Sequence, residues 1–193
     1  YKQSLEIALE KLNNEIVETS WSDSLSSSRG KDVIVDLKSI EGLIIEKRSS
    51  IINKNKNKIF SYLMTLGGNN GWLYANFLWI IRGYIDLLFG GVGLRRGRRN
   101  PSELKQGDAL DFWRVEKIVE NQLLRLKAEM KLPGKAWLQY EIISIDNNKC
   151  NLIQSAFFEP KGLGGLAYWY LLYPIHKIIF SGLIKTLNKN IYL

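Results

Sequence analysis

The sequence predicts a single α+β domain of the helix-grip kind, a curved antiparallel sheet wrapped on a long C-terminal helix with two helices inserted after the first strand. One observation is that residues 109–158 contain four strand-length runs separated by turn residues. Another is that residues 162–187 form a helical run with more aromatic side chains than a solvent-facing helix carries. We therefore expect this helix to pack against the sheet.

Length and composition are those of one globular domain. The chain has 193 residues, of which 46% are hydrophobic and 24% charged, which argues against disorder and against a polytopic membrane protein. The net charge of +8 is compatible with an anionic partner but does not identify one. A single cysteine cannot form an internal disulfide, so we expect a reducing compartment, the cytoplasm, with the surface of the inner membrane as an alternative location.

The first part of the chain differs from the rest in composition. Leucines at helical spacing predict an amphipathic helix over Lys2–Asn13, and the serine-rich segment Ser20–Lys31 is too polar to bury much surface. We expect the sequence to be the C-terminal part of a longer protein. In this interpretation residues 1–39 are the last helix and linker of a preceding domain, and residues 40–193 are the helix-grip domain.

The elements of the main domain follow from its patterns. Residues 43–52 are β-branched and alternate loosely, which predicts the first strand. Two helices follow, over residues 58–66 and 72–89, and we expect the second to be largely buried because Arg82 and Asp86 are its only charged residues. A glycine-rich and arginine-rich loop then leads to the four-stranded meander.

The meander is the clearest part of the pattern. In residues 124–132 apolar side chains alternate with charged ones, as in a strand with one wet and one covered face. Pro133 and Gly134 predict a turn into a strand over residues 136–145, and a further turn leads to a strand over residues 151–158. The last helix follows Pro160, and Pro174 is expected to kink it.

Many aromatic side chains fall on these elements, and they could either line a ligand cavity or fill the core. Both environments are apolar and contain few polar groups, so composition alone does not separate them. Glu129 is a further polar group on a predicted strand that could bind the polar end of a ligand. However, the alternation along residues 124–132 turns Glu129 away from the apolar face. The candidate cavity-lining residues are Trp72, Tyr74, Phe77, Trp79, Phe112, Arg114, Trp137, Tyr140, Tyr168 and Trp169.

The arginine loop is the sharpest local feature of the sequence. Arg95, Arg96, Arg98 and Arg99 surround a glycine, and guanidinium groups can bind carboxylate or phosphate with two hydrogen bonds. The alternative is structural, since the same groups can form salt bridges that brace the loop against the sheet. The acidic candidates for these bridges are Asp108, Asp111, Glu116 and Glu129. Nucleic-acid binding is less favoured because one short cluster is not an extended basic stripe.

The sequence shows no catalytic constellation and no metal-ligand set. His176 has no second ligand at a suitable spacing, and Cys150 has no histidine near it in the sequence. Neither Gly90–Gly93 nor Gly162–Gly165 has the residues that a phosphate-binding loop requires. We therefore expect no cofactor within this chain.

Two apolar segments, residues 72–89 and 163–184, approach the length of a membrane-spanning helix. Charged residues or a proline interrupt both of them, and the sheet needs an apolar cover. We therefore expect both segments to be buried within the domain. Attachment to a membrane surface is the alternative.

Four stretches together resemble a known bacterial family: Gly67–Trp79, Gly93–Pro101, Gly107–Arg114 and Arg125–Leu138. That uncharacterised domain is similar to the START and pollen-allergen (SRPBCC) superfamily of helix-grip proteins. It commonly follows an NAD(P)-binding Rossmann domain of the atypical short-chain dehydrogenase type. The resemblance implies the fold and this domain context, and it carries over no catalytic residue.

The resemblance extends into the N-terminal part of the chain. Residues 1–23 resemble the closing helix of such a nucleotide-binding domain, including a short motif made of Glu18, Thr19, Trp21, Ser22 and Asp23. NAD(P) would accordingly bind in the preceding domain and not in this chain.

The leading functional interpretation is a noncatalytic module that binds a small hydrophobic ligand, a lipid or an aromatic metabolite, beside its own N-terminal Rossmann domain. A structural appendage, or one that docks on an anionic membrane surface, is the second hypothesis. A cavity enzyme of the same superfamily is the third, and no acid–base pair in the sequence supports it.

Overall fold

The computed structural model describes residues 34–40, 42–68, 71–94 and 98–191. The chain divides into two units, residues 1–30 and 31–193, and every described element belongs to the second. The expected helix over Lys2–Asn13 and the linker over Ser20–Lys31 lie outside the described residues. For residues 1–33 the assignment to a preceding domain therefore stays a prediction, whereas residues 34–39 lie in the first strand of the sheet.

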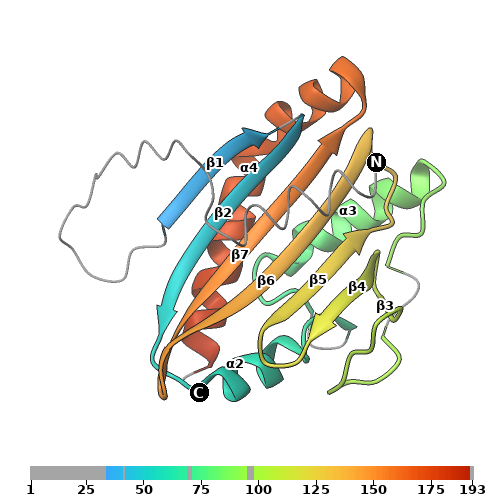
Figure 1. Cartoon of the computed structure of the whole chain (residues 1–193). Coiled ribbons are helices and arrows are strands. Elements are labelled where there is room, and N and C mark those ends of the chain that lie inside the picture. The colour runs from blue at the N-terminus through green and yellow to red at the C-terminus, as the bar shows by residue number, and fades with distance from the viewer. Residues whose placement is uncertain (1–33, 41, 69–70, 95–97, 192–193) are drawn as a thin grey trace. The chain divides into compact units, whose positions relative to one another are not determined.

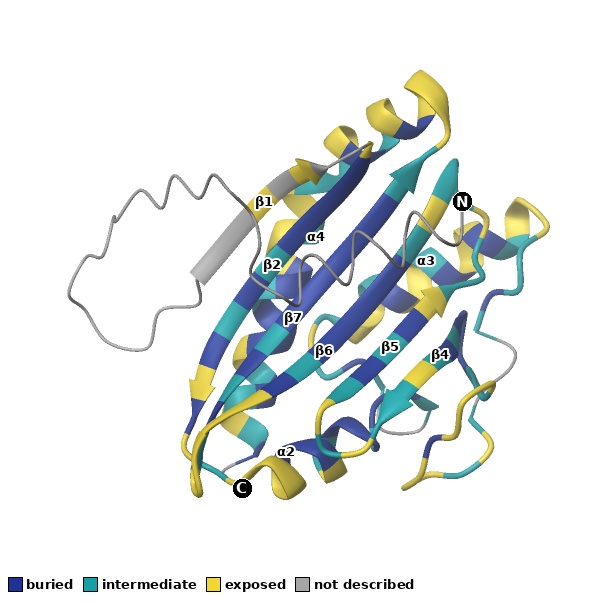
Figure 2. Cartoon of the chain, in the orientation of Figure 1, coloured by how far each residue is buried: buried dark blue, intermediate teal, exposed yellow. Residues whose placement is uncertain are grey.

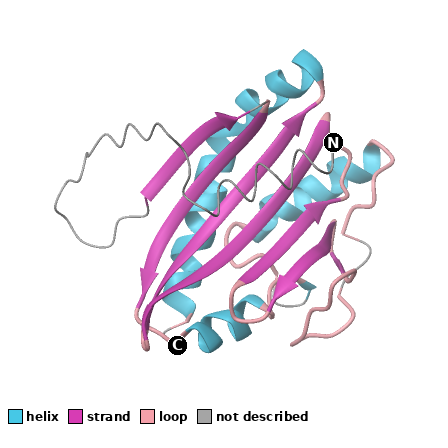
Figure 3. Ribbon diagram, viewed as in Figure 1, coloured by secondary structure: helices cyan, strands magenta, loops and turns pink. Residues whose placement is uncertain are grey.

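The described part contains one antiparallel sheet with three helices (Figures 1 and 3). Its strand order is β1-β2-β7-β6-β5-β4-β3, and each neighbouring pair is antiparallel. The strands are β1 (Ile34–Ile40), β2 (Leu43–Ile52), β3 (Ala109–Leu110), β4 (Trp113–Val119), β5 (Leu123–Ala128), β6 (Gly134–Asp146) and β7 (Lys149–Pro160). The helices are α2 (Lys56–Leu63), α3 (Asn76–Leu88) and α4 (Gly162–Asn190).

This architecture is the predicted helix-grip fold, with one correction at its start. The two helices follow β2, whose bounds are those expected for the first strand. However, β1 precedes it and pairs with it from Ile34 opposite Ser49 to Ile40 opposite Leu43. The sheet therefore begins at residue 34, whereas the predicted domain boundary was at residue 40. The sequence of β1 is short and partly polar, and by itself it did not indicate a strand. The strand is recognised by its pairing with β2.

The predicted meander is confirmed strand by strand. Leu124 and Leu126 of β5 and Leu138 of β6 are fully buried on the inner face, where Leu126 pairs with Leu138. Their neighbours Arg125 and Lys127 point to the outer face, as strand alternation requires. Figure 2 shows this alternation in β4 and β5, whereas consecutive residues are buried in the middle of β6 and β7.

Local backbone chemistry shifts both inserted helices from their predicted bounds. Helix α2 begins earlier than predicted because the Asn55 side chain caps it by accepting a hydrogen bond from the Lys58 amide at 2.9 Å. Helix α3 begins four residues later than predicted because Leu73 and Ala75 have left-handed φ values of 37° and 50°. These conformations are incompatible with continuing the helix toward Trp72.

Helix α4 lies against β2 and β7, behind the sheet in the view of Figure 1. Leu183, Ile184 and Leu187 in its C-terminal half are fully buried in the main hydrophobic core. The helix runs without a break through Pro174. The proline has no amide hydrogen, so the carbonyl of Tyr170 has no helical partner at that point.

The expectation that both apolar segments are buried holds only for their inner sides. In α3 the buried residues are Trp79, Gly83 and Asp86, while the outer side exposes large apolar side chains. The N-terminal half of α4 does the same. Within the described ranges, no helix is both long enough and apolar enough to cross a membrane.

Asp86 joins three parts of the chain that are distant in sequence. Its buried carboxylate accepts hydrogen bonds from the amide of Gly93 at 2.9 Å and from the amide of Lys131 at 2.6 Å. Arg82, one turn earlier, places a guanidinium nitrogen 3.7 Å from the same carboxylate and donates to the Lys131 carbonyl at 3.0 Å. Gly91 is needed beside it, because a Cβ there would lie 2.2 Å from the Asp86 carboxyl group. Asp86 thus holds the loop between β5 and β6 against α3.

Replacing Asp86 with alanine should lower the free energy of unfolding by about 3 kcal/mol, because two buried amides lose a charged acceptor. Urea denaturation followed by circular dichroism measures this change. Asp146→Ala is the matched control, since the exposed Asp146 carboxylate accepts one bond, from the Asn148 amide. Equal destabilisation by the two variants would contradict the structural role given to Asp86.

Candidate functional site

A cavity of about 590 Å³ lies between the sheet and the two helices α3 and α4. Its floor includes Ala136 of β6 and Ala156 of β7, which face inward beside the larger Phe158 and Leu138. Small side chains at these two positions leave space that the flanking residues do not fill. The cavity is therefore a consequence of two alanines in strands that otherwise carry bulky residues.

One wall of the cavity is an aromatic cluster from α3 and β4. Trp79 and Trp113 line the cavity, and Trp72 and Phe112 pack behind them. The ring centroids of Trp72 and Trp79 are 5.1 Å apart, and those of Trp79 and Phe112 are 5.7 Å apart. Trp72 is fixed further by its indole N–H, which donates to the Asp111 carboxylate at 2.8 Å. Each ring of this wall packs against another ring, and this packing restricts its movement.

The opposite wall is a row of rings along α4. Trp169 stacks on Phe158 with centroids 5.3 Å apart, and His176 lies 5.2 Å from Trp169 and 5.5 Å from Phe180. All four residues line the cavity. Phe158 and Trp169 belong to a small core cluster separate from the main one, and the cavity has lining residues from both.

The cavity opens between the two helices. Ile81, Ile85 and Phe89 of α3 and Leu171 and Ile175 of α4 line it, and each of these side chains is also exposed at the surface. They form the rim of the opening. A ligand entering by this route would pass between these apolar side chains.

The structure brings some of the predicted aromatic residues to the cavity. Trp79, Tyr168 and Trp169 line it. Trp137 borders it too, but strand alternation turns its side chain to the outer face, where the indole N–H donates to Glu116 at 3.3 Å. Trp137 therefore borders the cavity through its main chain.

The other predicted lining residues lie elsewhere. Trp72 and Phe112 form the layer behind the first wall, while Tyr74 and Phe77 are exposed at the surface. Tyr140 is fully buried in the main core, and this burial raises the pKa of its hydroxyl above the usual value. For Phe77, the helical pattern indicated an apolar residue but did not indicate which side of α3 faces the sheet.

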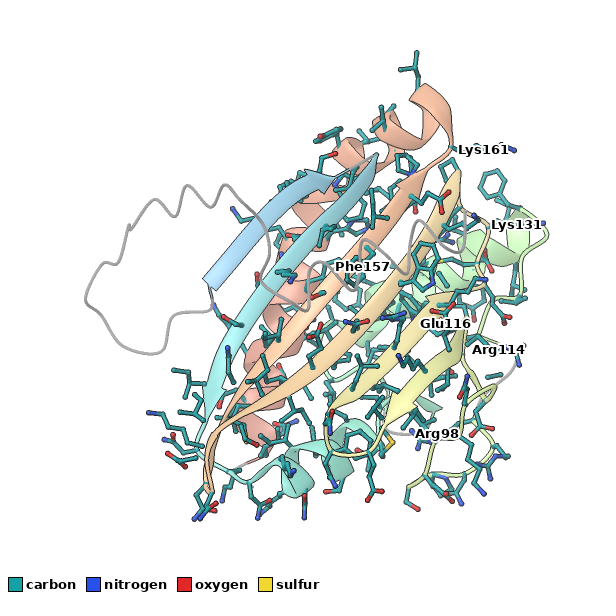
Figure 4. All side chains as sticks on the ribbon, in the orientation of Figure 1. Arg98, Arg114, Glu116, Lys131, Phe157 and Lys161 are labelled. Carbon is teal, nitrogen blue, oxygen red and sulfur yellow. The ribbon has the colours of Figure 1, made fainter. Side chains whose placement is uncertain are left out.

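Arg114 does not reach the cavity either. Its guanidinium forms two hydrogen bonds with the Glu129 carboxylate, at 3.0 and 3.1 Å, and donates to the Gly107 carbonyl at 2.8 Å. Figure 4 shows Arg114 beside β4, near the edge of the sheet. The pair braces the loop before β3.

The described part of the arginine loop is structural. Arg98 donates to the main-chain carbonyls of Met64, Leu66 and Asn100, and burial lowers the pKa of its guanidinium. Arg99 forms two bonds with Asp108, at 2.9 and 3.0 Å, and this pairing raises the pKa of Arg99 and lowers that of Asp108. Arg95 and Arg96 lie outside the described residues, so their anion-binding role stays a prediction.

Sequence reasoning missed a buried polar group on the inner face of β2. Glu46 and Arg48 form an ion pair whose side chains are both 0% exposed. Arg48 also donates to the Ser181 hydroxyl at 3.2 Å, and its guanidinium lies 5.5 Å from the centre of the Phe180 ring. One Glu46 oxygen and one Arg48 nitrogen are buried without a hydrogen-bond partner. Charged residues are mostly exposed, so the consecutive charges of Glu46, Lys47 and Arg48 did not indicate a buried pair.

His176 lines the cavity and is affected by the charge of Arg48. Burial, reinforced by the positive charges of Arg48 and Arg82, lowers the pKa of His176 to about 4. The ring is therefore neutral at physiological pH, and its buried Nδ1 has no hydrogen-bond partner. A neutral imidazole can either accept or donate a hydrogen bond, so it can act as a polar contact for a ligand.

Replacing one residue of the buried ion pair should destabilise the fold more than replacing both. Glu46→Leu or Arg48→Met alone should lower the free energy of unfolding by about 3 to 5 kcal/mol, because each leaves an uncompensated buried charge. The double variant should recover much of this loss. Urea denaturation of the four proteins forms a double-mutant cycle, and additive losses would contradict a direct coupling.

Acid should weaken the fold through His176. Unfolded histidine binds a proton near pH 6.5, whereas His176 in the folded state does so only near pH 4, so stability present above pH 6.5 is lost as the pH falls toward 4. The loss should be on the order of 3 kcal/mol. Because the chain has one histidine, subtracting the pH profile of His176→Gln from that of the wild type isolates the effect. Parallel profiles would show that His176 does not titrate in this way.

The similarity to one known structure supports the fold. The chain is similar to a protein from Arthrobacter aurescens, with TM-score 0.51, 11% identity, and coverage of 82% of this chain and 91% of that chain. It is also similar to truncated norcoclaurine synthase from Thalictrum flavum, with TM-score 0.49, 6% identity, and coverage of 84% and 97%. A conserved protein of unknown function from Enterococcus faecalis gives TM-score 0.42, 10% identity, and coverage of 80% and 75%. At these identities the similarity concerns the fold alone.

The family comparison is more specific than the structural one. No curated protein matches the sequence. A model described as "Protein of unknown function (DUF2867)" matches residues 45–183, from β2 into the C-terminal half of α4. The match covers the walls, floor and rim of the cavity and well over half of the 193 residues. Together with the helix-grip topology, this shows that the chain belongs to the DUF2867 family.

Proposed function

We propose that this domain binds a small, mostly apolar ligand in the cavity between the sheet and helices α3 and α4. The observation that supports the proposal is the cavity of about 590 Å³, whose walls are aromatic and whose floor contains Ala136 and Ala156. Cavities for small molecules commonly measure about 300–1,000 Å³ and are lined in this way. A lipid chain or an aromatic metabolite has the size and polarity for such a site.

The polar groups at the cavity limit the chemistry of the ligand. The polar residues among those lining it are Arg82, Lys131, Tyr168 and His176, and the described lining contains no carboxylate. A neutral or anionic polar group would therefore be accepted, whereas a cationic group would find no countercharge. The ligand proposed is an apolar body with an oxygen-rich or uncharged polar end.

We propose further that the module does not catalyse a reaction by itself. A general acid–base mechanism needs a pair of groups whose pKa values suit proton transfer near neutral pH. Burial lowers the pKa of His176 to about 4 and raises that of Tyr168, which moves both away from neutrality. Among the residues that the structure describes, no three or more His, Cys, Asp and Glu side chains are grouped to hold a metal ion.

The domain context remains part of the proposal. The sequence resemblance supports a position after an NAD(P)-binding domain, in which case the cavity would serve a larger protein by supplying or sensing its ligand. Within this proposal the cofactor belongs to the preceding domain. A cavity enzyme would instead need an acid–base pair whose pKa values suit proton transfer near neutral pH.

Filling the cavity tests ligand binding directly. Ala156→Trp places a large ring on the floor and should weaken binding of the apolar probe anilinonaphthalene sulfonate by about tenfold or more, measured by fluorescence titration. Ala167→Trp is the matched control, because Ala167 is exposed on α4 and lies outside the cavity lining. Circular dichroism and urea denaturation establish that both variants are folded.

Native mass spectrometry adds a measurement that does not depend on the probe. The wild-type protein should retain a co-purified apolar molecule, or take up an added fatty acid, and Ala156→Trp should not. Equal probe and fatty-acid binding by the wild type and Ala156→Trp would overturn the proposal.

A further inference from the structure

The outer sides of α3 and α4 carry an unusual amount of exposed apolar surface. On α3, Tyr84 is 70% exposed and Leu88 82% exposed, and on α4, Leu163 is 84% and Leu171 79% exposed. Isolated exposed apolar residues are normal on a protein surface, but a contiguous apolar patch usually marks an interaction site.

These side chains are arranged in two stripes. On α3, Phe77, Ile81, Tyr84 and Leu88 recur at intervals of three or four residues, so they share one side of the helix. The stripe on α4 consists of Leu163, Tyr170, Leu171, Ile175 and Ile178. Because Ile81 and Ile175 line the same cavity, the two stripes meet at its opening.

The two helices expose no acidic side chain. Helix α4 contains no acidic residue, and the only acidic residue of α3 is the buried Asp86. Lys177 is exposed on α4, the exposed Lys131 and Lys161 lie outside the two helices, and Figure 4 shows Lys131 beside α3 and Lys161 at the start of α4. An apolar surface bordered by cations is complementary to a bilayer with anionic headgroups.

We propose that this surface, the outer sides of α3 and α4 around the cavity opening, docks on an anionic lipid bilayer. The apolar side chains would enter the headgroup and acyl boundary while the lysines contact lipid phosphates. Docking in this orientation turns the opening toward the membrane, so that an apolar ligand passes from lipid to cavity without crossing water. The surface goes beyond the proposed ligand binding and does not depend on it.

The absence of exposed acidic side chains on α3 and α4 distinguishes this partner from a second copy of the chain. A symmetric interface would bring Lys131, Lys161 and Lys177 near their own equivalents or near one another, and like charges destabilise such a contact. An anionic bilayer instead supplies the missing countercharge over an extended area.

Vesicle flotation tests the docking surface. The wild type should float with vesicles of phosphatidylcholine and phosphatidylglycerol in equal amounts, bind pure phosphatidylcholine vesicles less, and be released by high salt. Leu88→Glu with Ile178→Glu should weaken binding to the anionic vesicles by about tenfold or more, because two exposed apolar side chains become anionic. Both residues are exposed and lie outside the cavity lining.

The matched control is Ile143→Glu with Ile145→Glu. Both side chains are about half exposed, at 50% and 53%, near the end of β6 and away from α3 and α4. This variant adds the same negative charge and should lose little binding. Equal loss in the two double variants would show that net charge alone attracts the protein, which would overturn the docking surface.

The two assays distinguish a failure of the ligand proposal from a failure of the docking proposal. Ala156→Trp should still float with anionic vesicles, and Leu88→Glu with Ile178→Glu should still bind anilinonaphthalene sulfonate in lipid-free buffer. Loss of flotation with retained probe binding in the helix variant supports docking at this surface. A wild type that does not float overturns docking, as does a wild-type dimer that this variant converts to monomers.

Discussion

The packing of α4 against β2 and β7 is the contact on which the rest of the structure depends. A helix is about 10 Å wide and strands are about 4.8 Å apart, so one helix covers about two strands. The sheet has seven strands, and the inner face of β4, β5 and β6 needs a second cover. Helices α2 and α3 and the loops around them supply it. The space left between α3 and α4 is the cavity.

The cavity persists because its walls are held independently of each other. On one side, Asp86 fixes α3 to the loop before β6, and Asp111 fixes Trp72 behind the first aromatic wall. On the other side, Phe158 and Trp169 stack where α4 begins. Protein interiors are close-packed, and they relax only partly around missing volume. Here the aromatic walls are braced from behind, so Ala136 and Ala156 leave a space that the walls do not close.

The same arrangement explains the unusual placement of polar and apolar groups. Glu46 and Arg48 are buried beneath α4, where the pair costs desolvation but fixes Ser181 and the neighbouring turn of the helix. The apolar stripes on the outer sides of α3 and α4 are left exposed. The two proposals share one feature, the cavity opening at which apolar side chains of α3 and α4 are exposed.

The sequence by itself determined the periodic features. Alternation located β2 and the β5–β7 meander, and the apolar run after Pro160 located α4, because each pattern follows from one element having one buried face. Only the tertiary structure decided which side of α3 faces inward, that Trp137 points outward, and that Glu46 and Arg48 are buried. The physical reason is that these outcomes depend on neighbours distant in the chain. The small residues Ala136 and Ala156 were visible in the sequence. However, small side chains leave a cavity only where the residues on both sides are held in place by other contacts.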